Sequence, residues 1–169
     1  MQFALTLALL TVLAIAIRTD ILAHRIPNAL TGIGACAGLL LQTLHAGTPA
    51  LLLSLGGIAA GVGVMLPFYL LRGMGAGDVK LMGTVGSFVG PQAVLLAGGA
   101  TLVVGAVIGI GVVAGHFLSR RSAIPELQTV TSPSIRKEKF PYAVAIAGGT
   151  LVSLTHFGQL AALTGVFYR

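Results

Sequence analysis

Long apolar runs follow one another along most of the sequence, and only short polar or glycine- and proline-containing stretches separate them. A run of about 20 apolar residues is long enough to cross a bilayer as a helix. Charged residues make up 8% of the chain and hydrophobic residues 56%, whereas about a quarter of a soluble domain is charged. A chain with so few charges cannot cover its surface in water. We therefore expect an all-α, polytopic membrane protein in which residues 1–169 form a single membrane-embedded domain, with the lipid bilayer as a partner.

The breaks between the apolar runs predict six transmembrane helices. The expected helices cover Met1–Ile17, Ala29 to about Leu44, Ala50–Leu71, two helices within Val79–Leu118, and Phe140 to about Phe167. As one helix, Val79–Leu118 would measure about 60 Å, which is two bilayer crossings. Its reversal is expected at Gly90-Pro91 rather than at Gly98-Gly99, because proline interrupts the hydrogen bonding of a helix. The polar stretch Ser119–Lys139 is expected to form a loop.

The positions of the basic residues support this count of six crossings. Nine of the ten lysines and arginines fall in or beside the first, third and fifth connections, and Arg169 is the tenth. Six crossings place these connections on one side of the membrane, which the positive-inside rule assigns to the cytoplasm. Both termini then lie outside, in a multi-pass protein of the cytoplasmic (inner) membrane. Because this rule accounts for the net charge of +6, no nucleic-acid partner is expected.

The chain has four acidic residues, Asp20, Asp78, Glu126 and Glu138, and only the two aspartates adjoin strongly apolar segments. Asp20 is expected just past the first helix and Asp78 at the start of the fourth, which places both at the same depth. An acid at membrane depth is costly and by default marks a functional site. Two neighbouring carboxylates can share a proton, so one can activate water while the other donates to a carbonyl oxygen. These are the roles needed to hydrolyse a peptide bond without a covalent intermediate.

Each aspartate also has a purely structural interpretation. Asp78 suits the cap of the fourth helix, and Asp20 suits a solvated loop acid among neighbouring arginines. The alternating glycines Gly73, Gly75 and Gly77 favour the functional interpretation, because they clear side chains from beside Asp78. That clearance allows close backbone approach or an extended substrate alongside, and a helix cap would not need it.

Three motifs in this order resemble those of type IV prepilin peptidases, the A24 family of GxGD aspartic proteases. Gly75–Leu81 resembles the GxGD signature, Asp20 followed by Arg25-Ile26-Pro27-Asn28 resembles the first motif, and Lys139–Gly148 resembles the last. The resemblance implies an endopeptidase that removes the leader of prepilins or pseudopilins on the cytoplasmic side, usually after a glycine that precedes the apolar segment of the pilin. It also implies that Asp20 and Asp78 are the catalytic pair.

The size of the chain resembles the compact peptidases of the CpaA/TadV type, which serve Flp pili, and also archaeal preflagellin peptidases. Longer members of the family carry an insertion with paired cysteines and N-methylate the new pilin end. This chain has one cysteine, Cys36, and no room for that insertion, so the resemblance does not imply methyl transfer. The lone cysteine and the dispersed histidines give no metal-ligand pattern, and no metal or cofactor is expected.

Seven further residues are candidates for supporting the site or binding substrate: Gly75, Gly77, Lys80, Pro27, Asn28, Pro141 and Tyr142. Lys80 could steer substrate charge or hold the loop, and it could equally be a topology signal. Asn28 is interpreted as the cap of the second helix in preference to a substrate contact. Tyr142 could reach the active face or anchor at the membrane interface, as tyrosines do.

Two other functions compete with the peptidase. A small proton-coupled transporter could use the aspartate pair as a cation site, but the chain lacks acids in the middle of its predicted helices, where coupling sites usually lie. A structural subunit of a pilus or secretion machine that has lost activity is disfavoured because both acids are present. The sequence does not identify the pilin or the oligomeric state.

Overall fold

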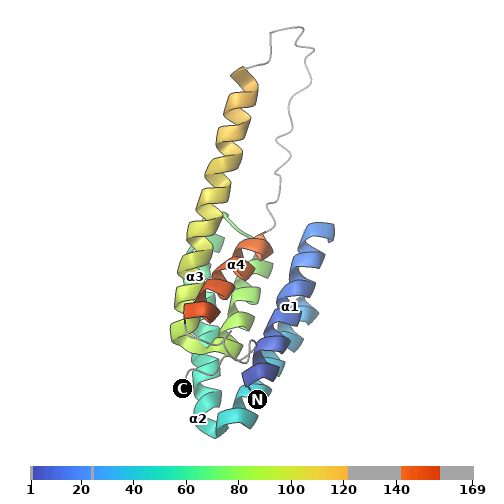
Figure 1. Ribbon diagram of the computed structural model, residues 1–169, viewed down its shortest axis with the longest axis vertical. Helices are drawn as coiled ribbons and strands as arrows, with labels where there is room; N and C mark the ends of the chain where they lie inside the picture. The colour runs from blue at the N-terminus through green and yellow to red at the C-terminus, as the bar shows by residue number, and fades with distance from the viewer. Residues whose placement is uncertain (1, 24, 122–141, 157–169) are drawn as a thin grey trace.

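The computed structural model describes residues 2–23, 25–121 and 142–156, and within these ranges the chain is all-helical, as predicted. The helices are α1 (Gln2–Ala23), α2 (Asn28–Leu70), α3 (Ala76–Arg121) and α4 (Tyr142–His156). They form a bundle from which the C-terminal part of α3 extends beyond the other helices (Figure 1).

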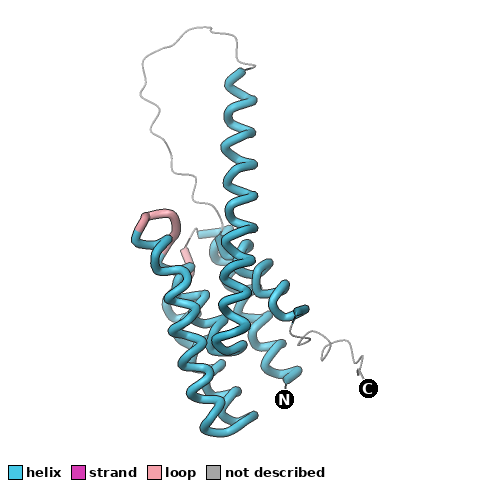
Figure 2. Tube along the Cα trace, turned by 90° about the vertical axis from the view of Figure 1, so that its left-hand side faces the viewer, coloured by secondary structure: helices cyan, strands magenta, loops and turns pink. Residues whose placement is uncertain are grey.

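Two of these helices contain a break in the backbone. In α2, Ala46 and Gly47 leave the helical conformation ahead of Pro49, and in α3 the break is at Gly90, directly before Pro91. The two glycines have positive φ angles of 73° and 79°, which glycine adopts readily because it has no Cβ. The chain turns back at both points (Figures 1 and 2). The predicted reversal at Gly90-Pro91 is therefore confirmed.

Among the described residues, three helices are long and apolar enough to cross a membrane, and Tyr142–His156 is a shorter apolar helix. The three candidate spans are Gln2–Ala23, Asn28–Leu70 and Ala76–Gly111. Two predicted segments fall partly outside the described residues. They are the last helix, Phe140 to about Phe167, and the loop Ser119–Lys139.

The first helix is longer than predicted, which changes the setting of Asp20. The sequence predicts Asp20 just beyond a helix that ends at Ile17, but α1 continues to Ala23 and holds Asp20 at the start of its last turn. The physical reason is local, because Arg18–Ala23 contain no glycine or proline and nothing interrupts the helix before Pro27. Asp20 is therefore a buried helical residue and not a loop residue.

The first half of α3, which carries Asp78, lies in the centre of the bundle. Every residue from 81 to 88 is buried. This helix approaches the second half of α2 so closely that a Cβ on Gly86 would overlap the carbonyl oxygen of Gly57. A Cβ on Gly61 would likewise lie 2.5 Å from the carbonyl oxygen of Met82. Small residues that let backbones approach are typical of helix packing in membranes, and here they fix the position of the helix that begins at the glycine-rich turn.

Candidate active site

A glycine-rich turn joins α2 to α3 and presents Asp78. The end of α2 is closed by two backbone bonds of 2.9 Å, from the amide of Arg72 to Tyr69 and from the amide of Gly73 to Phe68. Arg72 takes a left-handed conformation (φ 59°), as the residue after a helix end often does. This geometry ends α2 so that α3 begins a few residues later, at Ala76.

The carboxylate of Asp78 makes one hydrogen bond within the described part of the chain. Its Oδ2 accepts from the backbone amide of Gly75 at 3.0 Å, while the Asp78 amide donates to the carbonyl of Gly75 at 3.1 Å. This is half of a capping box, in which an acid on the third helical residue reaches back to the amide of the cap residue; Gly75 has no side chain, so its backbone carbonyl accepts from the Asp78 amide instead. The structural interpretation of Asp78 as a helix cap is therefore correct for one of its oxygens. A Cβ on Gly75 would lie 3.2 Å from the same oxygen, so glycine gives the carboxylate its space.

Asp20 faces the start of α4. Its Oδ2 accepts a hydrogen bond of 3.2 Å from the backbone amide of Ala143, and the Asp20 side chain is buried. The first amides of a helix have no partner inside it, and the helix dipole favours an anion at this end. The alternative that Asp20 is a solvated loop acid is therefore wrong.

The two aspartates come from helices that are far apart in sequence, and the fold places them within electrostatic reach of each other. Asp20 is 7% exposed and Asp78 is 8% exposed. Among the described residues, neither carboxylate forms a salt bridge, and each is bonded through a single oxygen to a backbone amide. The pair is thus two buried acids, each with one oxygen that the described residues leave unbonded.

The Ile26-Pro27-Asn28 segment packs against the glycine-rich turn. The Nζ of Lys80 donates to Oδ1 of Asn28 at 2.9 Å, and a Cβ on Gly77 would lie 3.1 Å from the Cβ of Ile26. Pro27 is the N-cap residue of α2, and no side chain caps this helix. The prediction that Asn28 caps the second helix is therefore wrong, because its side chain oxygen faces Lys80 instead.

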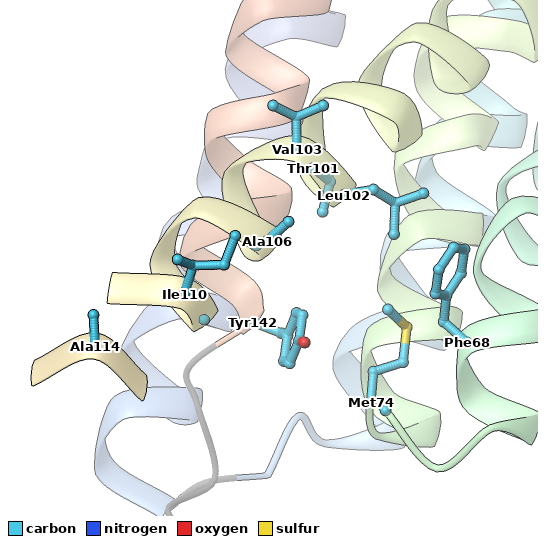
Figure 3. A pocket seen from close by; sticks show the side chains of 12 residues that line it. Phe68, Met74, Thr101, Leu102, Val103, Ala106, Ile110, Ala114 and Tyr142 are labelled. Atoms are coloured by element: carbon cyan, nitrogen blue, oxygen red, sulfur yellow. The ribbon is translucent and has the colours of Figure 1, made fainter. Parts of the chain in front are cut away.

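Tyr142 opens α4 and lines an open apolar groove of about 970 Å³. The groove lies between the end of α2, the glycine-rich turn and the second half of α3. Figure 3 shows Tyr142 and Met74 on opposite sides of its lower part. Pro141, the other candidate from this motif, lies outside the described residues. Within the described chain, no three histidine, cysteine or acidic side chains lie close enough together to hold a metal ion.

Residues 7–110 match the model of the type IV leader peptidase family. The chain belongs to this family. Neither the comparison with curated proteins nor the comparison with solved structures found a match. Membership makes the chain a protease, and its long apolar helices make it an integral membrane protein.

The matched range includes Asp20, the Ile26-Pro27-Asn28 segment and the whole glycine-rich turn of this leader peptidase, and it ends before α4. The bond from the Ala143 amide to Asp20 and the apolar groove are not predicted by the sequence. The amide could have been sought, because the first turn of every helix offers unpartnered donors. The groove had no comparable signal, because its walls come from three segments that only the fold brings together.

Proposed function

We propose that the protein is an aspartic endopeptidase that cleaves the leader of type IV, Flp-like prepilins or pseudopilins. In this proposal Asp20 and Asp78 are the catalytic pair and require no cofactor. The observation that carries it is that two buried acids, from α1 and α3, lie within electrostatic reach of each other in a member of a leader peptidase family. The substrate is a prepilin, and no nucleic acid takes part.

The pair can perform hydrolysis with water as the nucleophile. One carboxylate takes a proton from water as the oxygen attacks the scissile carbonyl carbon, and the other, protonated, donates to the carbonyl oxygen. The first acid then gives the proton it took from water to the leaving nitrogen, the second takes a proton back from a hydroxyl of the tetrahedral intermediate, and the bond between carbon and nitrogen breaks. Two carboxylates that face each other resist double ionisation, which keeps one of them protonated for this task. The amides of Gly75 and Ala143 hold one oxygen of each acid and orient the other.

The six-crossing topology belongs to the same proposal. The breaks at Gly47 and Gly90 divide α2 and α3 into two passes each, which with α1 and the final helix gives six. Arg18, Arg72 and Lys80 then flank the aspartates on one side, which is cytoplasmic by the positive-inside rule. Both termini lie outside the inner membrane, and residues 1–169 act as one domain.

Cleavage of a prepilin by the purified protein in detergent tests the proposal. We expect Asp20→Asn and Asp78→Asn each to lower the cleavage rate by about a thousandfold, which is within the range for loss of a general acid or base. Glu126→Gln and Glu138→Gln, the same change at the two remaining acids, should cleave like the wild type. Cleavage that persists in both aspartate variants would end the proposal. Proton-coupled uptake without proteolysis would favour the transporter instead.

A further inference from the structure

The apolar groove adjoins the candidate catalytic pair at both of its walls. Met74 lines the groove and directly precedes Gly75, whose amide donates to Asp78. On the other wall, Tyr142 directly precedes Ala143, whose amide donates to Asp20. Neither aspartate lines the groove itself, but each of these lining residues is the sequence neighbour of the amide that holds one carboxylate, so the groove ends next to the pair.

One face of α3 forms the longest wall of the groove. Leu102, Gly105, Ala106, Gly109 and Ile110 line it at intervals of three and four residues, which is the spacing of a single helix face. Glycine and alanine within this face leave room for another chain to approach the backbone closely. Figure 3 shows the Leu102, Ala106 and Ile110 side chains of this face turned toward the hollow.

The chemistry of the lining favours an uncharged occupant. No acidic or basic side chain lines the groove. Its two hydroxyl groups belong to Thr101 and Tyr142, and that of Thr101 already donates to the carbonyl of Ala97 at 2.7 Å. A charged segment would lose its hydration here without gaining a partner, which is unfavourable.

We infer that this groove binds the apolar residues of the substrate next to the scissile bond, and that Ala106 and its neighbours on α3 select for them. The inference rests on the proposed peptidase function and adds a specificity site to it. The position of Met74 and Tyr142, directly before the two amides that hold the aspartates, favours substrate over other occupants. A second copy of the chain would block the approach to the pair. The described part of the chain ends at His156, about 21 Å along the helix from Tyr142.

Two matched substitutions on α3 test the inference. Ala106 is exposed and lines the groove, whereas its neighbour Val107 is 65% exposed and does not line it. Ala106→Phe fills the groove, and Val107→Phe adds an aromatic ring to the same turn outside it. Because both side chains are exposed, neither change disturbs the buried core.

Two synthetic substrates complete the experiment. Both carry the same residues around the scissile bond, but one continues into an apolar stretch of about 20 residues and the other into a polar stretch of equal length. With the apolar substrate we expect Ala106→Phe to lower kcat/KM about tenfold, mainly through KM, and with the polar substrate to change it less than about twofold. Val107→Phe should match the wild type on both. Equal effects of Ala106→Phe on the two substrates, or none on either, would overturn the inference.

Disulfide cross-linking identifies the occupant directly. In a Cys36→Ser background that also carries Asp78→Asn to keep the substrate intact, we expect Ala106→Cys to cross-link to a cysteine in the apolar stretch of the substrate, and Val107→Cys to do so poorly. Dimers linked through position 106 that added substrate does not suppress would show a second copy in the groove and contradict the inference. A wild type that cleaves neither substrate would instead refute the proposed function.

Discussion

The backbone amide of Ala143 donates a hydrogen bond of 3.2 Å to Oδ2 of Asp20, although the two residues are 123 positions apart. The bond joins the C-terminal part of α1 to the first turn of α4. It gives an acceptor to an amide that the helix itself cannot satisfy. Asp20 therefore stabilises the junction of two helices in addition to its proposed catalytic role, and substitutions can separate these contributions.

Replacing Asp20 with asparagine keeps an oxygen that accepts the bond from Ala143 but removes the carboxylate. We expect Asp20→Asn to unfold in detergent near the wild-type temperature while it loses cleavage. Asp20→Leu leaves a buried amide without an acceptor, which costs about 1–3 kcal/mol, so this variant should be both inactive and less stable. Thermal melts followed by circular dichroism, together with a cleavage assay, measure both effects. If the two variants were equally destabilised, the charge rather than the acceptor would hold α4.

Gly77→Ala tests the packing of the glycine-rich turn on the Ile26 segment. The added methyl group would lie 3.1 Å from the Cβ of Ile26, so the two segments must separate by a few tenths of an ångström. Because this shift moves α3 relative to α2 near Asp78, we expect kcat to fall about tenfold, since small displacements at a catalytic site are costly.

The control for Gly77→Ala is Gly63→Ala in α2, where a new Cβ meets nothing within 4 Å. Both changes raise helix propensity by about 1 kcal/mol, so a general effect of alanine would appear in both. We expect Gly63→Ala to cleave like the wild type and to be equally or more stable. Comparable losses of activity in the two variants would contradict the role assigned to the contact with Ile26.

The sequence predicts features that depend on local chemistry and misses those that depend on distant partners. Gly90-Pro91 breaks its helix wherever it lies, so the reversal could be predicted. The charges of Arg18 and Asp20 suggest that the first helix ends before them, whereas α1 continues to Ala23. Asp20 accepts its hydrogen bond from Ala143, 123 residues away, and no local pattern indicates that contact.

The same distinction applies to Asn28, whose type and position suit a helix cap. Its oxygen instead accepts from Lys80, 52 residues away. The sequence therefore predicts which residues form the site, whereas their hydrogen-bond partners, such as Lys80 for Asn28, can be identified only from the fold.

The bond between Lys80 and Asn28 predicts that these residues act together. If it fixes the turn that carries Asp78, then Lys80→Met and Asn28→Leu should each lower kcat by a similar factor, and the double variant should lose little more. Asn28→Asp keeps an acceptor and should retain activity. If Lys80 instead attracted substrate charge, Lys80→Met alone would raise KM, and its effect would fade at high salt. Cleavage kinetics of the four variants at two ionic strengths distinguish these outcomes.

Because Gly57 and Gly86 lie so close together, we expect position 86 of α3 to tolerate a larger side chain poorly. A Cβ at position 86 would overlap the backbone carbonyl of Gly57, which no rotamer change can relieve. We expect Gly86→Ala to lower stability by about 1–3 kcal/mol, as overpacking does. It should also reduce cleavage, because α3 must move away from α2.

Gly99→Ala provides the matched control on the same helix, since a Cβ there meets nothing within 4 Å. This variant should be as stable as the wild type or more so, because alanine favours the helix by up to about 1 kcal/mol. Thermal unfolding of both variants in one detergent measures the difference. A Gly86→Ala protein as stable as Gly99→Ala would mean that the two backbones lie further apart than the contact of Gly57 with Gly86 implies. Contacts other than the one between Gly57 and Gly86 would then have to hold Asp78 in position.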